Sequence, residues 1–562
     1  MKKSLLHAFG TLLVSTLLAG CSFGGTTDPS NPSGPSGPTD TRTPISSIAE
    51  LAQLNNSKGN FKLDADLDFS EYGNWTPING FKGQLDGENH TITNFNYEFT
   101  ADDNVGLFGT LEGNVNNLTI SGNLVAKGGC NNVGLLAGTN KGIISGIKTA
   151  GSITAEYSTN VGGVVGYTTY QFGSCENNAT VVGLNSVGGV VGYVYLKVGQ
   201  TLETGSDNKA TISGQTNVGG VYGYIYSAEY STGYGVEMQI PNSHNTGNIT
   251  ASKDYVGGVA GIIVSKNGNT IALSYCSNSG TIQGDNYVSG IVGGGTRLGQ
   301  ILYCDNTGNV TASGSYVGGY VGGSTSAVVV DAINSTSIEG STYVGGIAGL
   351  AKSVSGSENK GTVKCTGFDT VDNKMVARFG GVVGSATIVN NCKNTGTLNV
   401  VTQGGRVGGV VGELTLTGEA QTVEGNENSS DITAQGNDVG GVFGYISSEL
   451  HKSYNTFNIE LKKNKNSGVI TSNSNHIGGI VGQFYGKLSS GSHTNGRVTF
   501  NTNTNSANVT GFKYVGGLVG YANRALDDEN MWPTNTQTGT IVSTGGDYSG
   551  NYYGVINDTL LD

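Results

Sequence analysis

A short glycine-rich motif recurs along most of this chain and constrains its fold more than any other feature. The motif reads apolar-Gly-Gly-apolar-apolar-Gly, as in Val161 to Gly166 and Val515 to Gly520. Its first apolar residue falls at positions 105, 133, 161, 187, 218, 256, 288, 317, 344, 379, 407, 439, 477 and 515. A single repeat of this length cannot bury its own apolar face, so the repeats must stack on one another.

A second element precedes most copies of the motif and reads Asn-x-small-x-aliphatic, as in Asn278 to Ile282 and Asn394 to Leu398. The apolar stretches are short, rich in Val and Ile, and bounded by Gly, Asn, Ser and Thr, which is typical of strands. We therefore predict an all-β fold, a parallel β-solenoid of roughly fourteen coils. Stacked asparagines would join their amides along the axis. The paired glycines would suit corners that need positive φ or close backbone approach.

The first residues have the features of a bacterial lipoprotein signal. Lys2 and Lys3 precede an apolar run, which ends in a Leu-Ala-Gly-Cys sequence at Cys21 that resembles the lipoprotein cleavage box. The resemblance implies that residues 1–20 are removed and that Cys21 carries acyl chains such as palmitate, which would anchor the protein in a membrane. Ser22 follows the cysteine, and by analogy with lipoprotein sorting a non-acidic residue there favours the bacterial outer membrane.

The rest of the chain divides into four segments. Residues 21–44 form the anchor and a Pro/Ser/Gly-rich tether, and residues 45–103 an N-terminal cap with the first strands. A short helix is expected within residues 45–55, capped by Ser46 or Ser47. The repeats occupy residues 104–523, and residues 524–562 are expected to be a C-terminal cap or closing strands.

One family resemblance covers residues 45–523. The block of Trp75-Thr-Pro-Ile78, Phe81-x-Gly-x-Leu-Asp-Gly-x-x-His-x-Ile92 and Val105-Gly-Leu-Phe-Gly109 resembles the opening of GLUG-motif bacterial surface proteins, and the later repeats look like the GLUG motif itself. The resemblance implies a right-handed parallel β-helix and says nothing about activity. Similar repeats accompany a zinc peptidase domain in some streptococcal immunoglobulin A proteases. The His-Glu-x-x-His signature of that domain is absent from this sequence, so the peptidase activity does not carry over.

Composition narrows the classes of partner. The formal net charge is −12 and charged residues make up only 12% of the chain, which argues against binding to nucleic acid or to anionic lipid. Four cysteines, Cys175, Cys276, Cys304 and Cys392, each lie two residues before a repeat asparagine. This position predicts small buried side chains that point inward with the asparagines. Cys276 and Cys304 would be stacked neighbours, either free or bonded, and no Cys-x-x-Cys spacing indicates zinc.

Tyrosine gives the clearest candidate site. One set follows the last motif glycine and comprises Tyr167, Tyr193, Tyr195, Tyr224 and Tyr226. A second set precedes the first motif valine in four consecutive repeats and comprises Tyr255, Tyr287, Tyr316 and Tyr343. Strand alternation places both sets on the outer face, where aromatic rings suit stacking with sugar rings. For the second set, an aromatic ladder that only stabilises its own sheet is the competing explanation. Tyr230 and Tyr234 predict a loop over the first set.

The sequence offers no nucleophile with a base, no metal cluster and no phosphate-binding loop, so no catalytic residue, metal or cofactor is predicted. The nearest candidate acids are Glu176 and Asp207 in successive repeats, with Asp305 three coils further on. Two carboxylates one coil apart could share a proton or bind a cation, although solvated surface acids are the simpler explanation.

Three functions remain open. The preferred one is a non-catalytic, surface-exposed lipoprotein, an adhesin whose solenoid binds a glycan or a host surface protein. The second is a structural stalk in an envelope assembly. The third is a polysaccharide lyase or hydrolase that uses Glu176 and Asp207.

Overall fold

The computed structural model describes residues 40–556, with gaps that fall mostly between strands. The gaps are residues 101–102, 198–199, 201, 203, 229–236, 267, 368–369, 372–373, 376, 401–404, 418–419, 451–457, 489–496, 523–533, 547–548 and 551–552. Thr43–Asp562 forms one compact unit, to which the following description applies. The leader, Cys21 and almost all of the tether lie outside the described residues, as do Tyr230 and Tyr234.

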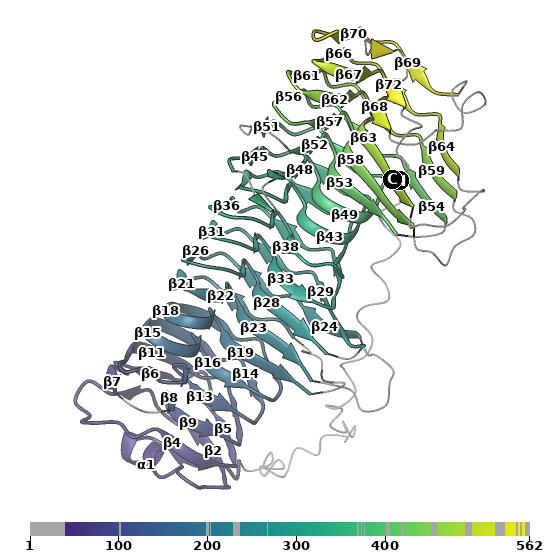
Figure 1. The fold of residues 1–562 in the computed structure, drawn as a ribbon. Coiled ribbons are helices and arrows are strands. Elements are labelled where there is room, and N and C mark those ends of the chain that lie inside the picture. Colours follow the sequence, from purple (N-terminus) through teal and green to yellow (C-terminus); the bar gives the residue numbers. More distant parts are fainter. Residues whose placement is uncertain are drawn as a thin grey trace, which may run out of the picture. The chain divides into compact units, whose positions relative to one another are not determined.

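The unit is a parallel β-solenoid, as predicted, in which short strands follow one another around each coil (Figure 1). One complete coil contains β27 (Val256–Gly257), β28 (Ala260–Ser265), β29 (Thr270–Ser274), β30 (Ser277–Asn278) and β31 (Ile282–Gly284), and β32 (Val288–Ser289) begins the next coil. Each of these strands pairs in parallel with its counterpart in the next coil, as β28 does with β33 (Val292–Thr296). An antiparallel hairpin, β46 (Thr370–Val371) with β47 (Lys374–Met375), forms a separate two-stranded sheet.

The fourteen copies of the motif stack in register, which confirms the periodicity. Val105 pairs with Val133, Val133 with Val161, and the same pairing continues from copy to copy through Ile477 and Val515. The following position of the ladder is Ser549 in β71 (Ser549–Gly550). Strands β69 (Thr536–Gln537), β70 (Ile541–Ser543) and β72 (Tyr553–Ile556) likewise add to the stack. Closing strands, rather than a different cap, therefore occupy this part of the C-terminal segment.

The repeat asparagines form a buried amide ladder, as expected. Along the ladder, Nδ2 of one asparagine donates to Oδ1 of the next at 2.7–2.9 Å, for example from Asn245 to Asn278 and from Asn278 to Asn306. The second Nδ2 hydrogen of Asn278 goes to the carbonyl of Gly280 in its own coil. These contacts satisfy polar groups that would otherwise be costly to bury.

The paired glycines are explained by close approach, and positive φ falls elsewhere. A Cβ atom on Gly258 would overlap the carbonyl oxygen of Gly290 in the next coil. Neither residue of the pair Gly257–Gly258 has a positive φ. The left-handed conformation instead belongs to the residue before the motif valine, such as Tyr255 with φ of 63°.

The cysteine column points inward, as predicted. Cys175, Cys276 and Cys392 are buried and Cys304 is partly buried, and all four carry free thiols. Burial raises the pKa of Cys175 and Cys392 to about 12, so these thiols stay protonated at neutral pH. In later coils asparagines fill the same column, and Asn426 Nδ2 donates to Asn464 Oδ1 at 3.0 Å. The side chains of this column are therefore part of the solenoid core.

A short helix stands at the start of the unit, as expected. Helix α1 (Ile48–Ala52) begins after Ser47, whose hydroxyl accepts from the backbone of Glu50 while the Glu50 carboxylate accepts from the backbone of Ser47. Leu51 is fully buried, which fixes the helix against the first coils. No helix among the described residues is long and apolar enough to cross a membrane.

Candidate functional site

The structure brings the first tyrosine set together as one patch on three consecutive coils. These patch tyrosines lie on β16 (Val165–Thr168), β19 (Val191–Leu196) and β23 (Tyr222–Ser227). Tyr167 pairs with Tyr193 and Tyr193 with Tyr224, while Tyr195 pairs with Tyr226. All five side chains are partly exposed, whereas Val194 and Ile225 between them are buried. The predicted alternation is thus confirmed.

The patch rings touch one another. Ring centroids are 5.3 Å apart for Tyr167 and Tyr193, 4.8 Å for Tyr193 and Tyr224, and 5.5 Å for Tyr195 and Tyr226. Tyr193 lies at the centre. Burial, and after it the four surrounding phenols, raise the pKa of its hydroxyl above the ordinary value. The Tyr193 hydroxyl therefore stays uncharged over the whole physiological pH range.

The second set forms a continuous stack, here called the ladder tyrosines. Centroids are separated by 4.6 Å for Tyr255 and Tyr287, 4.5 Å for Tyr287 and Tyr316, and 4.4 Å for Tyr316 and Tyr343, with interplanar angles of 6–21°. Burial is the largest cause that raises the pKa of Tyr287 and Tyr343 to about 12, and at Tyr343 it outweighs the lowering effect of Arg378. Because the ring faces cover each other, a ligand here would meet ring edges and hydroxyl groups. Face-to-face stacking of sugars on individual rings, as the sequence led us to expect, is not what this geometry favours.

The ladder tyrosines occupy a backbone position that suits other residues better. Their φ angles lie between 51° and 64°, in the left-handed region. Earlier coils place Asn160 and Asn217 at this position with similar φ, and asparagine tolerates it well. For a bulky side chain the same conformation costs roughly 1–3 kcal/mol, a kind of strain that clusters at functional sites.

Charged residues take over from the ladder in the next coils. The Arg378 guanidinium lies 4.4 Å from the centroid of the Tyr343 ring. Arg378 and Arg406 pair in register and both contact the carboxylate of Glu413, while His476 Nδ1 lies 2.8 Å from Asp438 Oδ1. We refer to this set as the charged cluster, which comprises Arg378, Arg406, Glu413, Asp438 and His476.

Sequence reasoning missed one aromatic pair. Tyr275 and Tyr303 stack with centroids 5.1 Å apart and are 56% and 64% exposed. Both have left-handed backbones and directly precede Cys276 and Cys304. Because both tyrosines directly precede residues of the inward cysteine column, the sequence could have predicted that they stack in neighbouring coils. We call them the corner pair.

The candidate acids are neighbours, but they are not arranged for acid catalysis. Glu176 pairs in register with Asp207, as predicted, and its carboxylate lies 2.8 Å from the Lys209 ammonium. Lys209, and then Asn178, lower the pKa of Glu176, whereas a general acid at neutral pH needs a raised value. Asp305 pairs with Ser277 further along the stack. Within the part of the chain that the structure describes, no group of three or more His, Cys, Asp or Glu side chains is placed to hold a metal ion.

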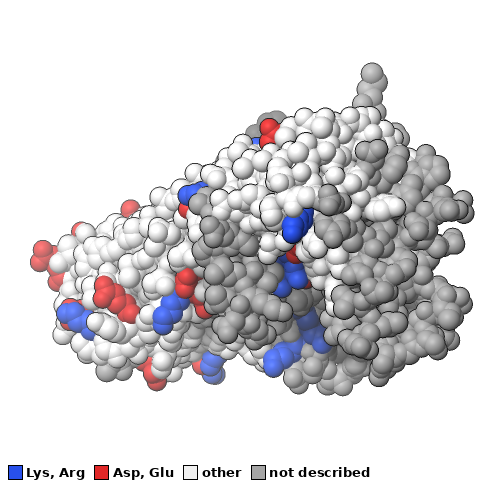
Figure 2. All heavy atoms as spheres, turned by 45° about the horizontal axis from the view of Figure 1, so that its top comes forward, with Lys and Arg blue, Asp and Glu red and all other residues white. Residues whose placement is uncertain are grey.

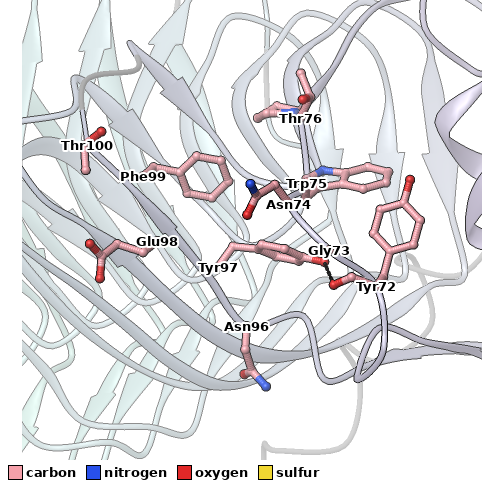
Figure 3. A pocket seen from close by; sticks show the side chains of 11 residues that line it. Tyr72, Gly73, Asn74, Trp75, Thr76, Asn96, Tyr97, Glu98, Phe99 and Thr100 are labelled. Carbon is pink, nitrogen blue, oxygen red and sulfur yellow. Dashed lines mark hydrogen bonds between the residues drawn. The ribbon is translucent and has the colours of Figure 1, made fainter.

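A separate pocket of about 520 Å³ lies near the N-terminal end of the stack. Figure 3 shows the rings of Trp75, Tyr97 and Phe99 around the Asn74 side chain. The Trp75 Nε1 donates to the carbonyl of Leu107, and the Tyr97 hydroxyl donates to the carbonyl of Tyr72. Its size and its mix of aromatic rings with an amide suit one small uncharged ring.

Charged side chains are sparse on the surface. Figure 2 shows one face on which Lys and Arg often stand beside Asp and Glu among a majority of uncharged residues. Some of the ion pairs among the described residues join two exposed groups, such as Lys465 with Glu427 at 2.8 Å. Exposed pairs of this kind contribute little to stability.

Comparison with known proteins gives distant similarities. No family model matches the chain. Over 158 residues it is 34% identical to halomucin of Haloquadratum walsbyi, covering 24% of this chain and 2% of that protein. Over 119 residues it is 32% identical to a "putative Gly-rich membrane protein" of Evansella cellulosilytica, covering 18% of this chain and 14% of the other. The crystal structure of a "putative immunoglobulin A1 protease" from Bacteroides ovatus aligns with a TM-score of 0.29 at 17% identity, covering 49% of this chain and 76% of that one.

Proposed function

We propose that this chain is a non-catalytic, lipid-anchored adhesin of the bacterial outer membrane whose β-solenoid binds a glycan. The observation that carries the proposal is the patch itself, where five partly exposed tyrosines from three coils form one uncharged aromatic surface. Aromatic groups with hydroxyls combine apolar contact with hydrogen bonding, which glycans require.

The anchor and the surface location belong to the same proposal. They rest on the charged start, the apolar run and the cleavage box at Cys21, and on the resemblance of the repeats to GLUG-motif surface proteins. Labelled palmitate should enter the wild-type protein and not a Cys21→Ala variant. Protease added to intact cells should remove the protein. If the protease leaves the protein intact in whole cells and digests it in lysed cells, the protein lies on the inner face of the outer membrane. The adhesin proposal would then be wrong.

The pairing of Glu176 with Lys209 supports a binding role over the lyase or hydrolase alternative. A carboxylate with a lowered pKa is a poor proton donor, and its ammonium partner is 2.8 Å away. Product release from any polysaccharide that is lost in a Glu176→Gln variant would contradict this reading.

A four-fold variant tests the binding site. Tyr193, Tyr195, Tyr224 and Tyr226 are changed to Ala, and binding to a glycan array is compared with that of the wild type. We expect the signal for the bound glycan to fall by tenfold or more, since each lost aromatic contact is worth about 1 kcal/mol. The matched control replaces Tyr275 and Tyr303, which removes exposed stacked rings from another corner of the coil.

Equal binding by the four-fold variant and the wild type would remove the patch as the site. A Tyr72→Ala/Tyr97→Ala variant then tests the N-terminal pocket. If the wild type captures a host surface protein and gives no signal with any glycan, the ligand is a protein.

A further inference from the structure

The two tyrosine sets lie on one strip of surface, although they occupy different positions of the repeat. In the position after the motif glycine, Tyr224 is followed by Ile262, Gly294 and Gly323 in successive coils. A Cβ atom on Gly294 would lie 3.2 Å from the Tyr255 ring. One on Gly323 would lie 3.0 Å from the Tyr287 ring and 3.1 Å from the Tyr316 ring. The ladder rings thus lean over the column in which the patch rings stand.

One aliphatic residue separates the two sets in this column. Ile262 pairs with Tyr224, and the Tyr255 ring lies over Gly294, which is the next position after Ile262. We call the resulting surface the tyrosine stripe. It runs through seven consecutive coils and comprises Tyr167, Tyr193, Tyr224, Tyr255, Tyr287, Tyr316 and Tyr343.

We propose that the tyrosine stripe binds one extended, uncharged polysaccharide chain that runs parallel to the direction in which the coils stack. This inference rests on the proposed glycan-binding function and extends it to a ligand class and an orientation. Apart from Tyr195 and Tyr226 at one end, the stripe is a single file of rings, so a long ligand gains contacts only by following it.

The spacing of the rings argues against an extended peptide as the ligand. Stacked neighbours along the stripe are 4.4–4.8 Å apart. An extended peptide repeats on one face every two residues, about 6.6–6.8 Å, and falls out of step with this spacing. A polysaccharide carries hydroxyl groups on every ring along its length and can meet a phenol hydroxyl or ring edge at each coil. Such contacts are hydrogen bonds, worth about 0.5–1.5 kcal/mol each.

Charge excludes acidic polymers. The seven stripe side chains are phenols, and the charged residues beside them include Asp254, which accepts from Asn286 at 2.9 Å, and Arg378 next to Tyr343. With a net charge of −12 on the chain, a polyanion would be repelled. The stripe ends where Arg378 covers Tyr343, and that arginine is already held by Glu413.

Oligosaccharides of defined length test the inference. The probes are uncharged glucose, xylose and mannose oligomers from disaccharide to octasaccharide, measured by calorimetry with the full chain. For the sugar that binds, we expect the affinity to rise with length by tenfold or more between the shortest and the longest oligomer. A Tyr287→Phe/Tyr316→Phe variant keeps the stacked rings and removes two hydroxyls. It should weaken the octasaccharide about tenfold and leave the disaccharide unchanged.

The control is Tyr275→Phe/Tyr303→Phe, which removes two hydroxyls from the corner pair and should match the wild type. If a sugar binds with an affinity independent of length, or if the octasaccharide binds the Phe variant and a Tyr287→Ala/Tyr316→Ala variant as tightly as the wild type, the stripe is a ladder that only stabilises the sheet. Lack of binding to any oligomer or array glycan would instead sink the proposed function itself. If the wild type binds a protein and the same variants do not, the ligand of the stripe is a protein and the polysaccharide proposal is wrong.

Discussion

One position of the repeat is occupied by tyrosine in one region of the solenoid and by charged residues in the next. Tyr255, Tyr287, Tyr316 and Tyr343 stand before the motif valine in four coils, and Arg378, Arg406, Asp438 and His476 stand there in the following four. Identical aromatic rings attract one another, so tyrosine can repeat without a compensating charge. Identical charges repel, so two stacked arginines need a compensating group between them.

The neighbouring column supplies that compensation. Beside the ladder tyrosines it holds Gly294 and Gly323, which leave room for the rings. Beside the arginines it holds Glu413, which contacts both guanidinium groups. Tyr445 follows Glu413 in this column, and Arg406 lies 3.6 Å from its ring centroid. The repeat therefore varies two columns together, and the identity of one residue constrains the other.

The backbone differs between the two regions as well. The ladder tyrosines have left-handed φ angles, whereas Arg378, Arg406 and Asp438 belong to strands β48 (Arg378–Gly380), β52 (Arg406–Gly408) and β57 (Asp438–Gly440) and have no positive φ. The aromatic region thus has the strained corner in all four coils, whereas in the charged region only His476, with φ of 59°, adopts it. The strained ladder tyrosines are also the residues to which we assign ligand binding.

Removing the shared carboxylate should give the largest effect. A Glu413→Ala change removes the carboxylate that both Arg378 and Arg406 contact, and their side chains are 19% and 18% exposed. We expect a local loss of about 3 kcal/mol, because removing one partner of a largely buried ion pair is costly. Hydrogen exchange of the amides in β48 and β52 measures it.

The control is Glu339→Ala, which breaks the more exposed pair with Lys364 and should cost at most about 1 kcal/mol. Equal protection in the Glu413 and Glu339 variants would show that the arginines tolerate each other, and the contrast between the two regions would lose its electrostatic basis.

Alkaline pH should affect the aromatic region next. The folded pKa of Tyr287 and Tyr343 is about 12, raised from an ordinary value near 10 mainly by burial. Since the raised pKa favours the protonated phenol in the folded chain, its contribution to stability is complete below pH 10 and is lost as the pH rises towards 12. Absorbance titration of phenolate in wild type and in a Tyr287→Phe/Tyr343→Phe variant measures the difference. The variant should lack the phenolate absorbance that the wild type gains late in the titration, at the higher pH. If the variant instead lacks absorbance that the wild type gains early in the titration, the ladder is not buried.

Much of this arrangement could be read from the sequence. The interval between the motif copies gives the stack, and the two tyrosine alignments give rings on the outer face, because side-chain alternation follows from strand geometry. Asn160 and Asn217 at the ladder position also signal a left-handed corner, although only the structure shows that tyrosine adopts it too. Periodicity works here because each coil repeats the environment of the one before.

Contacts between columns could not be predicted in the same way. The lean of the ladder rings over Gly294 and Gly323 depends on the corner conformation and on rotamers, which the repeat does not specify. The same holds for Glu413, which follows Gly405 by 8 residues in the sequence. Its carboxylate contacts Arg378, which belongs to the preceding coil. Gly294 and Gly323, which lie in the coils of Tyr287 and Tyr316, are the trace that such coupling leaves in the sequence.

The smallest expected effect separates strain from stacking at a single ladder position. In Tyr316→Asn the left-handed backbone becomes favourable, which should return about 1 kcal/mol and offset most of the lost ring contacts with Tyr287 and Tyr343. Tyr316→Ala loses the same contacts without that relief, so it should be less stable than the Asn variant by about 1 kcal/mol. Hydrogen exchange of the amides around Val317 in both variants gives the comparison. If the two variants are equally stable, the corner at Tyr316 carries no strain, and the contrast between a strained aromatic region and a relaxed charged region is wrong.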